Sequence, residues 1–216
     1  MMRSEDLIER LSAEVRPADS MRWPRLAIFW LSLSAGLAGL LVVFGLSLRP
    51  DIGNWLSNFA MQIKSAYTLG LSLASLLAFW ALSQPLGQNR LGPLFAIGLM
   101  MLTGAIALVE AQHLTPEALN HVWMAPSWAF CMGTIWALSA PILVVALWLM
   151  RQRAPVYPTQ AGLASGLLAG ALAASAYTLH CTEDSALFLF SWYTLGMALC
   201  GLTGAIAGHF TLRWRV

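Results

Sequence analysis

Charged residues are scarce in this chain. They make up 10% of its 216 residues, whereas 58% are hydrophobic and the mean hydropathy is +0.67. A soluble domain needs far more polar surface to cover its core, so this composition excludes a soluble globular protein. The net charge is only +2 and the basic residues are scattered, so there is no electrostatic footprint for nucleic acid. We therefore predict a protein embedded in a lipid bilayer, with no direct nucleic-acid partner.

Cysteine is also rare, and the motifs that commonly give it a role are missing. Cys131, Cys181 and Cys200 form neither a CxxC pair nor a Cys/His finger, which argues against a dithiol oxidoreductase and a structural zinc module. Nucleophile-elbow, phosphate-loop and metalloprotease patterns are missing too, so we expect no enzyme and no catalytic residues. The apolar segments lack interior acidic and basic residues, which disfavours a pump or an ion-coupled transporter.

Six apolar segments dominate the rest of the chain, each near the roughly 17 to 25 residues that a helix needs to cross the hydrocarbon layer. They are residues 26–48, 66–82, 91–109, 128–150, 162–179 and 186–210. Irregular backbone is not tolerated in lipid, so helices are the expected form. We predict an all-α integral membrane protein with six transmembrane helices in three hairpins, divided into a leader (residues 1–25) and a transmembrane sensor domain (residues 26–216).

Basic residues are divided unequally between the two sides of these segments. Of the 12 Lys and Arg residues, only Arg49 and Lys64 fall in outer loops if the N-terminus lies inside. The positive-inside rule therefore places both termini in the cytoplasm. Two outer stretches predict short surface helices: an apolar stripe over residues 52–63, and Thr115-Pro116-Glu117, which combines a cap, a first-turn proline and a first-turn acid.

The leader has the pattern of a short amphipathic helix. Ser4 can cap it, Asp6 lies in its first turn, and Pro17 ends it. Its apolar face consists of Leu7, Ile8, Leu11 and Val15. Such a helix can rest on lipid or dock a partner protein. Its several acidic residues disfavour an anionic membrane surface, so we favour docking through the apolar face and Asp6.

Small residues recur at every fourth position in the last two apolar segments. They are Gly162, Gly166 and Gly170 in the fifth segment and Gly196, Cys200, Gly204 and Gly208 in the sixth. Rows of this kind let helix backbones approach closely in a membrane. We predict that the fifth and sixth segments form a tight hairpin, with Cys200 as a small packing residue.

The other two cysteines fall at similar depth on the outer side. Cys131 lies in the first turn of the fourth segment, and Cys181 follows the outer end of the fifth. Further polar residues on that side, candidates for accessory ligands, are His113, His121, His180, Glu183 and Asp184. Cysteine is often just a small buried hydrophobe, but outside the cytoplasm thiols meet oxidants and soft metals. We predict two sensor thiols, whose form as a disulfide or as a shared metal site stays open.

Several stretches, taken together, resemble the NrsF family of bacterial anti-sigma factors. They are Asp6-Leu7-Ile8 with Leu11 and Pro17, Leu48-Arg49-Pro50-Asp51, Ser127-Trp128 with Cys131, and Leu179-His180-Cys181 followed by Asp184, Ala186, Phe188 and Trp192. The resemblance implies a six-span protein of the bacterial inner membrane that holds an ECF sigma factor inactive. It also implies that Cys131 and Cys181 are functionally important and that the leader engages the sigma factor. Tyr193 departs from the pattern, because many relatives are expected to have histidine there.

The sequence thus favours a signal transducer over two alternatives. In this reading, an oxidant or a thiophilic metal alters Cys131 and Cys181, and the cytoplasmic leader releases the sigma factor. The alternatives are a membrane thiol oxidoreductase and a heavy-metal carrier, and both would leave the leader without a role. No cofactor is required, and a transiently bound thiophilic metal is the only one considered. The identity of the sigma factor, the inducing signal and the oligomeric state are left open.

Overall fold

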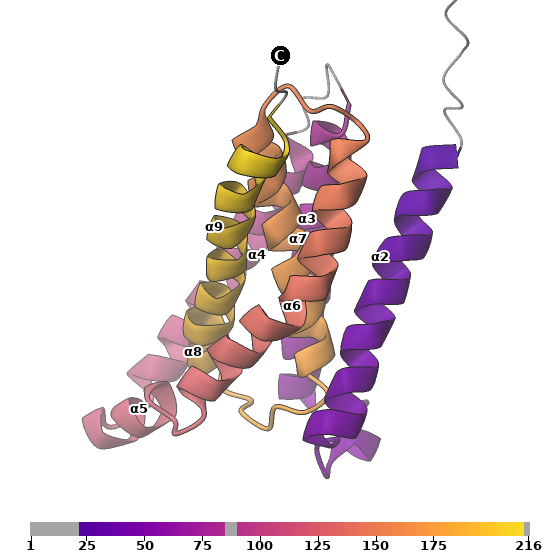
Figure 1. Ribbon diagram of the computed structural model, residues 1–216. Helices are drawn as coiled ribbons and strands as arrows, with labels where there is room; N and C mark the ends of the chain where they lie inside the picture. Colours follow the sequence, from indigo (N-terminus) through magenta and orange to yellow (C-terminus); the bar gives the residue numbers. More distant parts are fainter. Residues whose placement is uncertain (1–21, 85–89, 214–216) are drawn as a thin grey trace, which may run out of the picture.

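The structure, a computed structural model, describes residues 22–84 and 90–213, and all regular elements in these ranges are helical (Figure 1). This confirms the all-α fold class for the described residues. The predicted docking face of the leader, Leu7, Ile8, Leu11, Val15 and Asp6, lies outside them.

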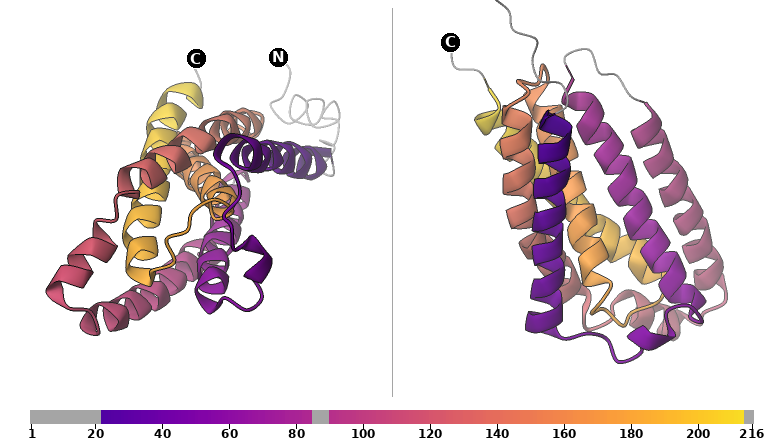
Figure 2. Two further views of the ribbon diagram at one scale, coloured as in Figure 1. Left: turned by 90° about the horizontal axis from the view of Figure 1, so that it is seen from below. Right: turned by 90° about the vertical axis from the view of Figure 1, so that its right-hand side faces the viewer.

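Long helices make up most of the described chain and run side by side as a bundle (Figure 2). They are α2 (Arg22–Leu41), α3 (Phe59–Leu82), α4 (Leu91–Gln112), α6 (Trp128–Arg151), α7 (Pro158–Tyr177) and α9 (Thr194–Thr211). The shorter elements are the 3₁₀ turn η2 (Ile52–Asn54), α5 (Pro116–Trp123) and α8 (Ala186–Phe188). Two π-helical turns, η1 (Val42–Leu46) and η3 (Leu189–Tyr193), extend α2 and lead into α9.

Five helical stretches of the described chain are long and apolar enough to cross a membrane. They are Arg22–Leu46, Phe59–Leu82, Leu91–Gln112, Pro116–Arg151 and Ala186–Thr211. The remaining long helix, α7, is rich in Ala and Gly and most of its residues are buried. A helix enclosed by its neighbours has little contact with lipid, so it does not need large apolar side chains.

Helix α7 forms the centre of the bundle, in contact with α9, α3, α6 and α2. Its closest neighbour is α9, and glycine makes that approach possible. A Cβ atom on Gly166 would overlap the carbonyl oxygen of Cys200, and one on Gly162 would lie 2.8 Å from Cα of Gly208. On Gly170 it would lie 2.8 Å from Cβ of Cys200. The two backbones therefore meet with almost no side-chain layer between them.

The other small residues of the predicted rows take similar positions. Gly204 and Gly208 face Gly162, whereas a Cβ atom on Gly196 would lie at an ordinary van der Waals distance, 3.6 Å, from Ile135 of α6. Of the three predicted hairpins, only that of α7 and α9 is a closely packed pair, because α2 packs mainly on α6 and α7, and α4 packs on α3 rather than on α6. A cavity of about 340 Å³ separates part of α2 from α3 and α7, and Leu31, Leu76 and Leu168 are among its lining residues.

The start of α2 is anchored by aromatic packing at one end of the bundle, called here the leader end. Trp23 is buried, lies 5.2 Å from Trp80 between ring centroids, and donates its indole N–H to the carbonyl of Leu149 at 3.3 Å. The guanidinium of Arg153 lies 4.8 Å from the Trp23 ring centroid and donates to the carbonyl of Ser83. These contacts join α2 to the ends of α3 and α6.

One of the two predicted surface helices is confirmed. Helix α5 starts at Pro116, and the Thr115 hydroxyl accepts from the N–H of Ala118. The prediction for residues 52–63 is wrong, because only a 3₁₀ turn forms before α3 begins at Phe59. Asn58 caps α3 by accepting from the N–H groups of Ala60 and Met61. The early start brings Lys64 into α3.

The glycine contacts predict the effect of adding one methyl group. Gly166→Ala should lower the free energy of unfolding by about 1–3 kcal/mol, the usual range for overpacking, because backbone atoms must move to admit it. Gly98→Ala is the matched control, since nothing lies within 4 Å of a Cβ atom there. Thermal unfolding of both variants in the same detergent measures the difference, and equal midpoints would contradict the close backbone packing.

Candidate functional site

The loop between α7 and α8, residues 178–185, carries the chemistry predicted from the sequence. The last turn of α7 tightens as the N–H groups of both His180 and Cys181 bond to the carbonyl of Tyr177. Ser185 then accepts from the N–H of Phe188 and caps α8. Between these two points the chain crosses one end of the bundle, called here the thiol end (Figure 1).

Two of the three cysteines meet at the thiol end. Cys131 lies in the first turn of α6 and is 0% exposed, and Cys181 lies in the loop and is 4% exposed. Their side chains lie close enough for each to affect the ionisation of the other, and both thiols are free. This interaction, with the positive charge of Lys64, lowers the pKa of Cys181 despite the burial that opposes it. The sequence alone did not show that the two thiols touch.

Arg49 fastens the chain that leaves α2 to this loop. Its guanidinium donates to both carboxylate oxygens of Asp184, at 2.9 and 2.8 Å, and to the carbonyl of Cys181 at 3.1 Å. It also donates to Asp51 at 2.6 and 2.7 Å, and lowers the pKa of that carboxyl group. The main-chain N–H of Arg49 donates to the carbonyl of Leu179 at 3.0 Å. One side chain therefore binds two carboxylates in bidentate fashion and the loop backbone as well.

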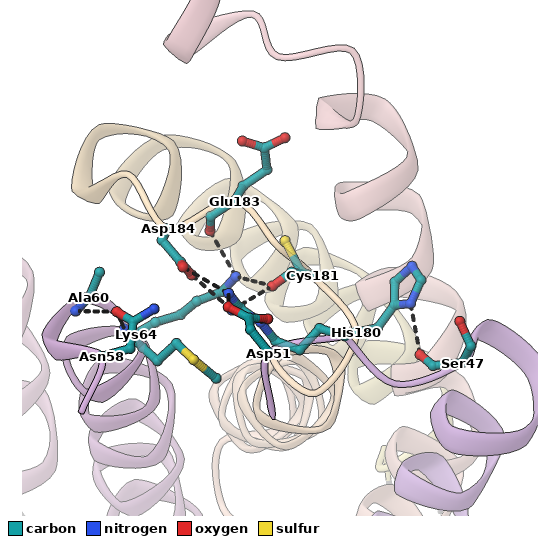
Figure 3. A network of polar contacts seen from close by, with 11 residues as sticks. Ser47, Asp51, Asn58, Ala60, Lys64, His180, Cys181, Glu183 and Asp184 are labelled. Carbon is teal, nitrogen blue, oxygen red and sulfur yellow. Dashed lines mark hydrogen bonds and ion pairs between the residues drawn. The ribbon is translucent and has the colours of Figure 1, made fainter. Parts of the chain in front are cut away.

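Lys64 holds the same loop from α3. Its Nζ donates to the carbonyls of Cys181 at 2.9 Å and Glu183 at 2.8 Å, as Figure 3 shows. It also lies 5.1 Å from the centroid of the Tyr193 ring. Only 2% of Lys64 is exposed. A buried ammonium group that is bonded to carbonyls favours negative charge nearby, which here includes the Cys181 sulfur.

A small cavity lies next to Cys181. Its volume is about 250 Å³, and its lining includes Ser47, Arg49, Ser127, Tyr177, His180 and Cys181. Cys131 is not part of the lining. The two thiols are therefore not equivalent, since one borders open space and the other is covered by the protein.

The predicted accessory ligands have other bonding partners. His180 Nδ1 donates to the carbonyl of Ser47 at 2.9 Å, and Glu183 accepts from the hydroxyl of Ser127 at 3.1 Å. Asp184 is ion-paired with Arg49. His113 follows the end of α4 and His121 lies in α5, both exposed and neither lining the cavity. In residues 22–84 and 90–213, no group of three or more His, Cys, Asp or Glu side chains is placed to hold a metal ion.

Sequence reasoning missed two functional residues and undervalued a third. Arg49 and Lys64 served as the outer basic residues of the topology count, Arg49 was also part of one stretch that carries the family resemblance, and Tyr193 was noted only as a departure from the family pattern. Arg49 could have been found from Leu48-Arg49-Pro50-Asp51, which pairs an arginine with an acid at the end of an apolar segment. Lys64 gave no such signal, because its bonding partners lie more than a hundred positions along the chain.

Comparison with known proteins decides the family. A family model described as NrsF: Negative regulator of sigma F matches residues 11–214. The chain belongs to the NrsF family. The Anti-sigma-F factor NrsF of Caulobacter vibrioides is 38% identical over 220 residues, covering 99% of this chain and 100% of the relative. The Probable anti-sigma-F factor NrsF of Azospira oryzae is 36% identical over 221 residues, with the same two coverages.

The NrsF match includes both thiols and the residues that surround them. No solved structure matches this chain.

Replacing the central arginine tests whether it holds this NrsF site together. Arg49→Met should lower the free energy of unfolding by about 2 kcal/mol, less than the loss of a partner in a fully buried pair. The reason for the smaller effect is that the Asp184 side chain is 24% exposed and partly screened by water. Arg151→Met, on an exposed arginine at the end of α6, is the control. Unfolding in detergent would refute the role if both variants lost equal stability.

Proposed function

We propose that this protein is a membrane anti-sigma factor that holds an ECF sigma factor inactive. The observation that carries the proposal is the end-to-end match to two proteins that are named as anti-sigma-F factors. The proposed partner is therefore a protein, and this chain would act by binding the sigma factor and not as an enzyme. The thiol oxidoreductase and heavy-metal carrier remain alternatives that no observation favours.

The proposed topology has six spans, with both termini in the cytoplasm. Five stretches satisfy the length and composition of a span, and α7 would be the sixth, shielded from lipid by its neighbours. The distribution of basic residues places the leader end in the cytoplasm and the thiol end outside, in the bacterial inner membrane. Arg49 and Lys64, the two basic residues on the outer side, fit this orientation. Both are buried and bonded to the loop between α7 and α8, so we do not count them as topology signals.

Sigma-factor binding is assigned to the leader, residues 1–25. An amphipathic helix with an apolar face is suited to helix-in-groove recognition, in which that face fills a groove of the partner. Its apolar face and acidic first turn fit a partner surface better than an anionic membrane. The last residues of the leader, 22–25, belong to α2, so a shift of α2 moves the point from which the leader extends.

Signal detection is assigned to Cys131 and Cys181, which respond to oxidants or to thiophilic metals. A disulfide between them would contribute about 2–4 kcal/mol, whereas a nearly complete switch needs roughly 5.5 kcal/mol. A disulfide alone would therefore give a partial response. A thiophilic cation would depend on the two sulfurs, since the described residues offer no third ligand of the usual kinds grouped with them.

The proposed route from the thiols to the leader runs through α2. The loop that contains Cys181 binds the chain after α2 through Ser47 and Arg49, so a change at the sulfur alters the support of that helix end. The rest of α2 packs on α6 and α7 beside a cavity. This arrangement suits a helix that shifts as a unit and carries the leader with it.

A charged substitution on the leader tests sigma-factor docking. Leu11→Asp should raise sigma-dependent transcription toward the level seen when the whole protein is deleted, because a carboxylate cannot enter an apolar groove without a large desolvation cost. Ala13→Asp adds the same charge on the opposite face of the predicted helix and is the control. Reporter transcription in cells and co-purification of the sigma factor provide the two measurements. Equal release by both variants would remove the apolar face from the proposal.

Serine substitutions test the sensor thiols. Cys131→Ser and Cys181→Ser should each abolish the change in sigma-dependent transcription that oxidant or thiophilic metal produces, since serine neither forms a disulfide nor binds soft metals well. Cys200→Ser is the control, because Cys200 packs in the α7–α9 contact, against Gly170. Normal induction in both sensor variants, with protein levels verified by immunoblot, would rule the thiols out.

A further inference from the structure

The two thiols differ in their access to small molecules. Cys181 lines a cavity of about 250 Å³, whereas Cys131 is fully buried and does not line it. Since a water molecule occupies roughly 30 Å³ of liquid, this cavity has room for a molecule as small as hydrogen peroxide. A reagent that enters from the cavity therefore meets Cys181 first.

The surroundings of the two sulfurs differ as well. The loop at Cys181 is held by the ammonium group of Lys64, which donates to the carbonyl of Cys181 at 2.9 Å and favours the thiolate form of that residue. Cys131 contributes its thiol as the hydrogen-bond donor that favours the same form. Nucleophilic attack on an oxidant requires a thiolate. The charge of Lys64 and the neighbouring cavity therefore both favour reaction at Cys181.

Tyr193 supplies an observation of a different kind. Its hydroxyl oxygen is the one buried side-chain oxygen or nitrogen of the described residues that lacks a hydrogen-bond partner, and its side chain is completely buried. The Tyr193 hydroxyl also lies near the Cys181 sulfur, and its interaction with that sulfur lowers the pKa of Cys181 and so favours the thiolate. A buried hydroxyl left unsatisfied costs free energy, and a thiolate accepts a hydrogen bond more strongly than a thiol does, so the Tyr193 hydroxyl is best satisfied when Cys181 is ionised.

We propose that Cys181 is the thiol that reacts with a hydroperoxide, that Cys131 is the resolving thiol, and that Lys64 and Tyr193 position and stabilise the reacting sulfur. This inference rests on the proposed sensor function and assigns unequal roles within the thiol pair. It also names the chemical class of the oxidant.

The chemistry balances in two steps. In the first, the Cys181 thiolate attacks one oxygen of the hydroperoxide, an S–O bond forms and the O–O bond breaks. The other oxygen leaves with the electron pair and is protonated to water or an alcohol, so sulfur is oxidised to a sulfenic acid and the peroxide is reduced. In the second, the Cys131 sulfur attacks Cys181, an S–S bond forms, the S–O bond breaks, and hydroxide leaves with the Cys131 thiol proton as water.

Variants that retain a single cysteine test the division of roles. Purified full-length protein carrying Cys131→Ser with Cys200→Ser retains only Cys181, and Cys181→Ser with Cys200→Ser retains only Cys131. Each is treated with hydrogen peroxide in detergent, the sulfenic acid is trapped with dimedone, and the adduct is measured by mass spectrometry. We expect labelling of Cys181 to be at least about tenfold faster than labelling of Cys131. Equal rates, faster labelling of Cys131, or no labelling of either would overturn the proposal.

The positioning residues are tested in the variant that retains Cys181. Tyr193→Phe removes only the unpartnered hydroxyl and should slow labelling several-fold with an unchanged thermal unfolding midpoint. Lys64→Gln should move the pH profile of labelling to higher pH, and Lys64→Arg, which restores the charge, should move it back. A purely structural role would alter the unfolding midpoint without shifting the pH profile. Unchanged rates and profiles in all three variants would remove both residues from the mechanism.

The result of the labelling experiment can be distinguished from the result of the transcription test of the proposed function. Labelling is measured on the purified protein and does not depend on a sigma factor. If Cys181 failed to react with peroxide but both serine variants still blocked the transcriptional response to thiophilic metal, the anti-sigma reading would stand and the peroxide chemistry would fall.

Discussion

Two buried cations hold the thiol end of this protein together. Arg49 and Lys64 both bond to the carbonyl of Cys181, at 3.1 and 2.9 Å, although they come from different elements. Backbone carbonyls in a loop have no partners within that loop, so the cations satisfy groups that would otherwise be costly to bury. Asp184 neutralises part of the added charge. The position of the Cys181 sulfur, its cavity and its approach to Cys131 all depend on this arrangement.

The glycine contacts fix the packing of α7 and α9 in the middle of the bundle, and the two cations fix the loop at its thiol end. Because α7 touches α9 through backbone atoms, α7 can occupy the middle of the bundle with four neighbours around it. The ends of α6 and α7 at the thiol end then fall close together, which brings Cys131 next to the loop that follows α7. The proximity of Cys131 and Cys181 therefore depends on helix packing as well as on the bonds of the loop.

Much of the fold was predictable from the sequence, because apolar length and helical form are linked in a membrane protein. The position of Cys131 and Cys181 at the same end of the bundle followed from their places at the ends of apolar segments. The roles of Arg49 and Lys64 did not, since they arise from contacts across more than a hundred positions of chain. The central place of α7 was also missed, because a row of glycines predicts close packing without specifying how many neighbours surround the helix. The apolar stripe near Ile52 misled for a further reason: Asn58 caps a helix that incorporates the end of that stripe.

The contact between α7 and α9 also determines where the protein can change shape. Sliding one helix along another requires a layer of side chains that can exchange rotamers, and these two helices have almost none between Gly162 and Gly204. Helices α7 and α9 are therefore expected to move as one rigid unit. Helix α2 packs on α7 beside a cavity of about 340 Å³, so a displacement of α2 against this pair disturbs less close packing than a displacement of α7 against α9.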